Sequence, residues 1–405
     1  MEPPSPSLRS TTAHGARSRR PRRFALAGAA AFVLVSATLL SGCAVGGITA
    51  IAAGLNSACA ISNGQVLCWG AVAYGDGSPI ADAQVAGPAA SGLTDAVQLA
   101  VGEANTYGFP NHVCARRATG AVVCWGDNTA GQLGDGTTTD RLVPTPVPGI
   151  TDAVQISAAG YLTCARHATG SVSCWGQNNT GQLGNGTFDP SSTPGAVTGV
   201  ADAVDIDVSE YTVCAVRATG TVACWGADNN GRLGNNDGVF ANLQPTPSTV
   251  WGLTGATKVE LRDSSVCAIA GGQVACWGRY IVPDHPSAMM TLDDPPYVIP
   301  GSSGAVDLTA VEDQACLLTA SGSVRCWSYG GGGGDGTNNA YSSATDIGLA
   351  NVTALGEADV NPLCVLLTNA EARCWGYNHS RALGVDTFPV GDKVLTPVSP
   401  IIGAG

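Results

Sequence analysis

Fifteen cysteines are the residues of this 405-residue chain best suited to chemistry, and fourteen of them fall into local pairs. Paired thiols can bind a metal, carry out redox chemistry or form a disulfide. Zinc ligands usually come in pairs about two to four residues apart, whereas these pairs are nine or ten positions apart. An even number in an exported chain is typical of disulfides. We expect seven bridges: Cys59–Cys68, Cys114–Cys124, Cys164–Cys174, Cys214–Cys224, Cys267–Cys276, Cys316–Cys326 and Cys364–Cys374.

The residues between the paired cysteines indicate β-hairpins. The two shorter pairs centre on Asn63-Gly64 and Gly271-Gly272, which two-residue hairpin turns prefer. Four longer pairs centre on Ala-Thr-Gly or Ala-Ser-Gly, and a three-residue hairpin loop places glycine at this last position. Both loop lengths put the cysteines opposite each other in a non-hydrogen-bonded pair, with Cα atoms about 4.5 Å apart. The last turn, Thr368-Asn369-Ala370, lacks the glycine and is the exception.

Other catalytic signatures are absent from the sequence. No His-Glu-x-x-His motif, no Gly-x-Ser-x-Gly turn and no phosphate-binding loop is present. The stretch "DNTAGQLGDG" suggests a calcium loop, but it lacks the alternating carboxylates of that motif. We therefore expect no enzyme, no cofactor and no metal. If the chain forms a propeller, several blades could still build a site at its central channel. The histidines after residue 42 are isolated: His112, His167, His285 and His379.

The first 42 residues form an export signal. The basic "ARSRRPRRF", the apolar "ALAGAAAFVLVSATLL" and "LSGC" follow one another in the order of such a signal. Cysteine after Leu-Ser-Gly resembles a bacterial lipoprotein signal, which predicts cleavage after residue 42, a lipid on Cys43, a tether over 43–47 and the fold over 48–405. A plain signal peptide or an uncleaved anchor is the alternative. Without residues 1–42 the chain has 13 basic and 30 acidic residues, a net charge of −17 that argues against nucleic-acid partners.

The dipeptide Cys-Trp recurs seven times at intervals of 48 to 56 residues. Each repeat has short alternating strands such as "AVQISA", "LTCARHA" and "SVSCWGQ", separated by glycine-rich turns, which is typical of a propeller blade. The end of the chain matches residues 142–150, but the strand "TDAVQIS" that follows residue 150 has no counterpart at the end. An extra strand is present instead near the start of the fold, at 46–54. We expect an all-β, seven-bladed propeller with one disulfide per blade, in which this N-terminal strand completes the last blade and closes the ring.

The sequences "CWGDNTAGQLGDG" at 124–136 and "CWGQNNTGQLGNG" at 174–186 resemble the regulator of chromosome condensation repeat. The resemblance covers about 46–402 and implies a seven-bladed propeller. It is strong in repeats two to four. The Gly-Gln-Leu-Gly part of the motif weakens to "SRALG" at 380–384, is absent from repeats one and five, and is replaced by "YGGGGGDGT" at 329–337 in repeat six. The tryptophans after each second cysteine are expected in the inter-blade core, and an aromatic ring for ligand stacking is the alternative.

Departures from the repeat indicate where a partner would bind. They are the insertion 103–111, the end of repeat four and the segment 279–301, and the alternative is a decayed repeat packed on its own blade. We expect a monomeric, non-catalytic binding or scaffold module for an unknown envelope or extracellular protein, anchored to the outer face of a bacterial membrane. The resemblance also leaves open nucleotide exchange, as in the founding member, an inhibitor as in a secreted relative, or an envelope enzyme. The candidate partner-binding residues are Tyr107, Phe109, Trp251, Tyr280, His285, Met289, Met290 and Tyr297.

Overall fold

A computed structural model describes residues 47–398 except 55, 73–74, 78–80, 84–89, 103–111, 238–241, 263–264, 280–294, 312–313, 329–334, 338, 359–361, 378–382 and 384–392. Residues 43–405 form one compact unit, separate from residues 1–42. Among the described residues, no helix is long and apolar enough to cross a membrane. The one short helical element in this part of the chain is the 3-10 turn η1 (Asn229–Gly231).

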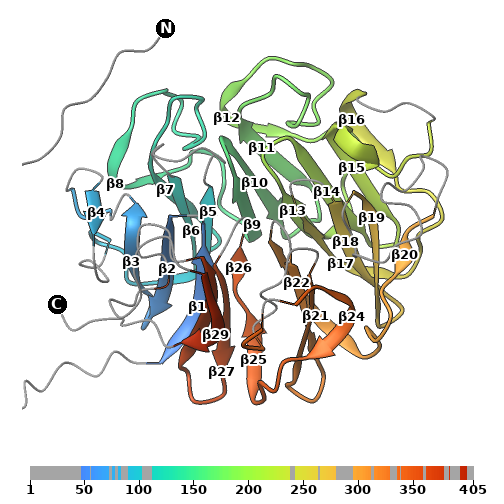
Figure 1. Cartoon of the computed structure of the whole chain (residues 1–405). Coiled ribbons are helices and arrows are strands. Elements are labelled where there is room, and N and C mark those ends of the chain that lie inside the picture. Colours follow the sequence, from blue (N-terminus) through green and yellow to red (C-terminus); the bar gives the residue numbers. More distant parts are fainter. Residues whose placement is uncertain are drawn as a thin grey trace, which may run out of the picture. The chain divides into compact units, whose positions relative to one another are not determined.

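The chain forms seven antiparallel sheets, the blades of a propeller (Figure 1). The innermost strands are β1 (Ile48–Ala53), β5 (Ala96–Gly102), β9 (Ala153–Ala159), β13 (Ala203–Val208), β17 (Ala256–Leu261), β21 (Ala305–Val311) and β25 (Val352–Leu355). The second strands are β2 (Ser57–Ser62), β6 (His112–Arg117), β10 (Leu162–His167), β14 (Thr212–Arg217), β18 (Ser265–Ala270), β22 (Gln314–Thr319) and β27 (Leu363–Leu367). The third strands are β3 (Gln65–Val72), β7 (Val122–Gly126), β11 (Val172–Gly176), β15 (Val222–Ala227), β19 (Gln273–Gly278), β23 (Val324–Ser328) and β28 (Ala372–Tyr377). The outer strands are β4 (Ala81–Ala83), β8 (Arg141–Pro146), β12 (Ser191–Ala196), β16 (Leu243–Thr249), β20 (Tyr297–Val298), β24 (Tyr341–Asp346) and β29 (Lys393–Val398).

The blades have two ends, which we name by the segments they carry. The turn face holds the hairpin turns between second and third strands, such as 168–170, and the connectors to the next blade, such as 197–202. The loop face holds the turns between first and second strands and the long loops between third and outer strands, such as 177–190. Each innermost strand therefore starts at the turn face and runs to the loop face.

The seven expected disulfides are confirmed, one in each blade. Paired cysteines are directly opposite each other in register, and their Cα atoms are 4.0–4.1 Å apart. The predicted turn chemistry is also present: Asn63 and Gly64 both have positive φ, as do Gly271, Gly272 and the last glycine of each Ala-Thr-Gly or Ala-Ser-Gly turn. The exceptional last turn has the same geometry, because Ala370 takes a φ of +62° where the other blades have glycine.

The N-terminal strand closes the ring, but not as a strand of the last blade. β1 pairs along its length with β2 and is the innermost strand of the first blade, so the expectation that it completes the last blade is wrong. The last blade has its own innermost strand, β25. Closure is a seam between the two blades, where β1 pairs in parallel with the two-residue β26 (Glu357–Ala358).

This closing seam repeats the contact found between other neighbouring blades. The Ile48 backbone N–H donates to the Ala370 carbonyl at 3.1 Å, and the Ala203 N–H donates in the same way to the Gly170 carbonyl at 2.8 Å. An apolar cluster of the first and last blades lies across the seam, with Ile51 and Trp69 on one side and Leu366 on the other. The ring is therefore held by equivalent backbone and apolar contacts at the seam that joins its ends.

Candidate functional site

The repeated tryptophans are core residues between blades, as expected. All seven of them, from Trp69 to Trp375, are at most 2% exposed. Trp175 packs in one cluster with Cys124 and Leu133 of the preceding blade, and its Nε1–H donates to the Gln132 carbonyl at 2.8 Å. A Cβ added at Gly134 would lie 2.7 Å from this Nε1 atom. The Gly-Gln-Leu-Gly motif therefore gives the next blade's indole both an acceptor and room to approach.

The loops that carry this motif are stabilised by a buried asparagine. The Asn178 side-chain oxygen accepts from the Leu183 N–H at 2.8 Å, and its amide nitrogen donates to the carbonyls of Thr187 and Asp189. Asn128 makes the equivalent contacts in the preceding blade. The polar atoms suggested as a calcium loop are therefore used to fold the loop. Among the described residues, no group of three or more His, Cys, Asp or Glu side chains is arranged to hold a metal ion.

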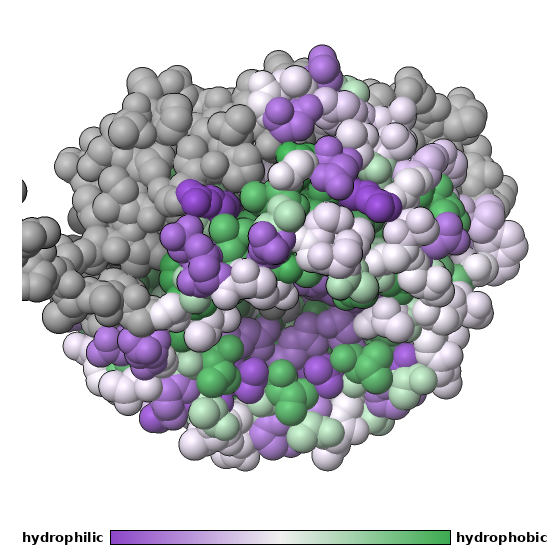
Figure 2. All heavy atoms as spheres, turned by 90° about the horizontal axis from the view of Figure 1, so that it is seen from below, coloured by the Kyte–Doolittle hydropathy of each residue, from purple (hydrophilic) through white to green (hydrophobic). Residues whose placement is uncertain are grey.

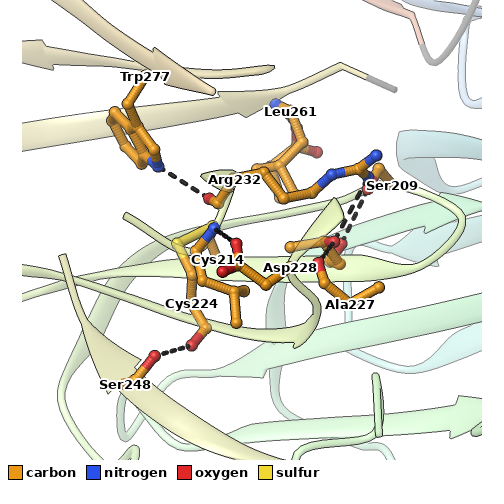
Figure 3. Close-up of a disulfide and its surroundings, with 12 residues drawn as sticks. Ser209, Cys214, Cys224, Ala227, Asp228, Arg232, Ser248, Leu261 and Trp277 are labelled. Carbon is orange, nitrogen blue, oxygen red and sulfur yellow. Dashed lines mark hydrogen bonds between the residues drawn. A yellow bond between two sulfur atoms is a disulfide. The ribbon is translucent and has the colours of Figure 1, made fainter. Parts of the chain in front are cut away.

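The fourth blade has Asp228 in place of this asparagine. One carboxylate oxygen accepts from the Leu233 N–H at 2.9 Å, and the other is buried with no hydrogen-bond partner among the described residues. Burial, together with the nearby Asp237 carboxylate, raises the pKa of Asp228 to about 6. Figure 3 shows the same blade, with Trp277 of the next blade donating to the Arg232 carbonyl and Ser248 donating to the Cys224 carbonyl.

We expect Asp228→Asn to stabilise the propeller above pH 6 by about 1–2 kcal/mol, because it removes a buried, incompletely bonded charge. An unfolded aspartate has a pKa of about 3.9, so the folded wild-type chain binds more protons between about pH 4 and 6 and loses stability as the pH rises through that range. Denaturant midpoints at pH 4 and pH 8 should therefore differ between the two proteins only at pH 8. The matched variant Asn178→Asp should acquire the wild-type Asp228 behaviour in the third blade. Equal stability of Asp228→Asn and wild type at pH 8 would contradict the assignment.

Neighbouring blades are joined inside the ring by polar side chains at the third position of the innermost strands. Gln155 donates to the Ile206 carbonyl at 2.9 Å and accepts from the Ile206 N–H at 3.2 Å. Gln98 makes the same pair of bonds to Ile156, and Asp205 accepts from the Val259 N–H at 2.8 Å. The blades are separate sheets and share no backbone ladder with one another. These side chains supply hydrogen bonds between the blades in its place. Sequence reasoning missed them, although the recurring "AVQ" and "AVD" at 96–98, 153–155, 203–205 and 305–307 are a visible signal.

Charged groups line a hollow between β1, β5, β9, β13 and β17, whose empty space is about 530 Å³ including volume open to solvent. Lys258 forms ion pairs with Glu260 and Asp307. Desolvation would lower the pKa of Lys258, but the surrounding carboxylates raise it well above its usual value. Lys258 therefore stays a cation at neutral pH and is not suited to act as a general base.

Asp207 is a buried carboxyl group that lines the hollow. Burial raises its pKa to about 6 against the opposing effect of hydrogen bonds from the Leu261 N–H and the Ser157 hydroxyl. These bonds are 2.7 and 2.9 Å long and connect three successive blades. A carboxyl with a raised pKa is typical of catalytic sites, but both oxygens of Asp207 are already engaged in joining blades.

The described histidines also serve the fold. Burial lowers the pKa of His112 to about 3, so the ring is neutral, and its Nε2 lies 2.8 Å from the Thr163 hydroxyl of the next blade. His167 contacts Asp152 at 2.6 Å on the turn face. The other two histidines, His285 and His379, lie outside the described residues.

The structure separates the predicted partner-binding residues. Trp251 is 47% exposed on the connector 250–255, at the turn face. Tyr297 is half-buried in β20, where it pairs with Cys276 and packs on its own blade's core. A Cβ at Gly252 would lie 3.3 Å from Pro295, so the connector that carries Trp251 lies against the residues just before β20. Outside the described residues are Tyr107, Phe109, Tyr280, His285, Met289 and Met290, together with Cys43.

The two faces differ in charge. On the described loop face the carboxylates are Asp76, Asp127, Asp135, Asp140, Asp189, Glu210, Asp228, Asp237 and Asp335, against the cations Arg141, Arg232, Arg262 and Arg279. Outside the hollow, the described turn face has Asp95, Asp152, Asp202, Asp346 and Glu371 against Arg116, Arg117, Arg166, Arg217, Arg325 and Arg373, with His167 in addition. The loop face is thus acidic and the turn face nearly neutral. Figure 2 shows one face of the molecule, where hydrophilic residues lie in a hollow bordered by hydrophobic ones.

The fold and repeats define the class of this protein as a seven-bladed, disulfide-linked propeller. Residues 119–166 and 169–216 match the family model described as "Regulator of chromosome condensation (RCC1) repeat". These two stretches are therefore RCC1 repeats, as their motifs predicted. A search of curated protein sequences finds no significant match.

Solved structures of yeast RCC1 (Prp20) and of human WBSCR16 have a similar fold. Yeast RCC1 (Prp20), solved with Kap60 bound, aligns with a TM-score of 0.67 at 17% identity, over 82% of this chain and 83% of that chain. Prp20p from Saccharomyces cerevisiae, studied for binding to Gsp1p and histones, aligns at 0.65 and 18%, over 88% and 86%. Human WBSCR16 aligns at 0.65 and 16%, over 78% and 85%. At these identities the likeness shows the fold alone.

Proposed function

We propose that this chain is an exported lipoprotein, anchored through Cys43, whose propeller binds a protein partner in the cell envelope without catalysing a reaction. Seven disulfides in one chain form and persist in oxidising compartments, which supports export. The "LSGC" sequence at the end of an apolar segment supports the lipid anchor at Cys43. The same disulfides argue against nucleotide exchange on a cytosolic GTPase, since that compartment keeps thiols reduced.

The observation that carries the binding function is the position of the departures from the repeat. β5 ends and β6 begins at the loop face, on either side of residues 103–111. β19 ends at the same face, before the segment that contains Tyr280, Met289 and Met290. Both irregular segments therefore leave the blades at the face that has an excess of carboxylates. An acidic face favours a partner with a basic surface, because complementary charge speeds association and selects the partner.

Site-specific photocrosslinking in the native envelope tests this function. A photoreactive amino acid at Phe188, a loop-face residue that is 47% exposed, should give one discrete protein adduct. The yield should fall as salt is raised, since about 0.1 M salt already screens charges beyond about 10 Å. Changing Tyr280, Met289 and Met290 to alanine should abolish the adduct, because aromatic and methionine side chains are favoured in interface cores. The same probe at Trp251 is the control for the turn face. An adduct only from Trp251, or an unchanged adduct in the triple variant, would overturn the proposal.

A further inference from the structure

Exposed β-branched side chains encircle the centre of the propeller at the turn face. They occupy the second position of every innermost strand, one from each blade, and all seven are exposed: Thr49, Val97, Val154, Val204, Thr257, Val306 and Thr353. The four valines are 38–56% exposed. The three threonine hydroxyls donate to carbonyls of the second strand of their own blade. The four valines have no such bond and are exposed, so packing within the blade does not account for them.

Trp251 adds a large aromatic side chain to this face. It is 47% exposed, whereas the seven repeated tryptophans are at most 2% exposed. Its own backbone N–H donates to the Gly234 carbonyl, which fixes the connector that presents the indole. An exposed tryptophan with one apolar side and a polar N–H is the residue preferred at the boundary between lipid and water.

Charges on the turn face cancel in local pairs. Asp95, Asp152 and Asp202 precede three successive innermost strands, and each contacts a basic side chain of its own blade: Arg117 at 2.8 Å, His167 at 2.6 Å and Arg217. Exposed pairs of this kind add little stability, but they remove net charge from the surface. Without residues 1–42 the net charge is −17, yet this face is one that an anionic or zwitterionic lipid surface would not repel.

The described chain begins at this same face. Ile48 bonds the Ala370 carbonyl in the last hairpin turn, and a Cβ at Gly47 would lie 2.3 Å from the Ala370 Cβ. Cys43 is four residues before Gly47 and so lies within about 14 Å of it along an extended chain. A lipid on Cys43 would therefore hold the turn face, and not the loop face, close to the membrane.

We propose that the turn face lies against the surface of a lipid bilayer, with Trp251 and the four exposed valines at the headgroup level and the acidic loop face directed away. This proposal rests on the proposed lipid anchor at Cys43. It assigns the exposed residues of the turn face to lipid, and leaves the loop face free for the protein partner.

Fluorescence quenching on vesicles tests the orientation. The compact unit Cys43–Gly405, with its seven disulfides formed, has one remaining thiol, Cys43, which can be coupled to a maleimide lipid in phosphatidylcholine vesicles. Lipids brominated near the headgroup should quench the wild-type tryptophan emission and leave Trp251→Phe unquenched, because the other tryptophans are buried. Coupling is chemical, so the result does not depend on whether cells attach a lipid to Cys43. Failure of the anchor in cells would be seen separately, in the mass of the native protein.

A matched reporter on the opposite face makes the test decisive. Phe188 is 47% exposed, the same as Trp251, and Phe188→Trp in the Trp251→Phe background places one exposed indole on the loop face. This indole should remain open to iodide in water and escape the brominated lipids. The proposal is overturned if the vesicle-bound wild type is not quenched by brominated lipid, or if both reporters are quenched to the same extent. Both substitutions are at exposed sites, and near-ultraviolet circular dichroism checks that the variants fold.

Discussion

Replacing Trp175 with alanine is expected to destabilise the propeller by about 3–5 kcal/mol, the usual cost of removing a buried tryptophan. The indole is 0% exposed and lies in the cluster that joins the second and third blades. Its loss leaves a cavity between two sheets and removes one of the two hydrogen bonds that the Gln132 carbonyl accepts, the other coming from the Thr163 hydroxyl. Gly134 and Leu133, which define the cavity wall, belong to a tightly bonded loop and cannot easily collapse into it.

Trp251→Ala is the matched control for this prediction. Trp251 is 47% exposed, and surface substitutions away from special contacts usually change the free energy of unfolding by less than about 0.5 kcal/mol. Guanidinium unfolding followed by circular dichroism measures both variants under oxidising conditions. A cost for Trp175→Ala close to that of Trp251→Ala would show that the repeated tryptophans do not hold the blades together.

Reduction of all seven disulfides is expected to unfold the protein at 37 °C. Each bridge closes a loop of about ten residues, for which the loop-entropy model gives at most about 2.5–3 kcal/mol. Native-like hairpins in the unfolded chain would lower this figure, yet half of the summed effect still compares with the whole stability of a typical protein, about 5–15 kcal/mol. The cysteines are all at most 1% exposed, so the sulfurs also contribute to core packing.

The double variant Cys164→Ala and Cys174→Ala separates one bridge from the set. Its free energy of unfolding should fall by at most about 2.5–3 kcal/mol, and it should stay folded. The six other bridges and the side-chain hydrogen bonds between blades remain. Thermal unfolding with and without a reductant measures both effects. A fully reduced chain that kept the wild-type melting temperature would contradict a structural role for the bridges.

The hairpins and disulfides could be predicted from sequence because they are local. Asn63-Gly64 and the Ala-Thr-Gly turns fix both the loop length and the register, and the cysteine spacing shortens by one residue when the turn does. The position of Trp175 also followed from strand alternation, which turns adjacent Cys174 and Trp175 to opposite sheet faces.

The start of each blade could not be read from a repeating pattern. A periodic sequence does not mark where one repeat ends and the next begins. The sequence therefore places the strand at 46–54 in the last blade, whereas β1 is the innermost strand of the first blade. Gln98 and Gln155 form hydrogen bonds to the backbone of the next blade. Which strand of that blade lies opposite them is decided by the closed ring and not by the local sequence. Asp228 could have been found by aligning the repeats, but its raised pKa depends on burial, which sequence does not give.

The intact mass of the protein isolated from its native envelope shows whether a disulfide-linked propeller is held at a membrane through Cys43. The protein would be denatured without reductant, treated with a thiol-alkylating reagent and weighed. We expect a chain that begins at Cys43, carries the added mass of a lipid and takes up no alkyl group. A chain that still contains residues 1–42, one whose Cys43 has no lipid and takes up an alkyl group, or one in which about fourteen further thiols are alkylated would contradict this expectation.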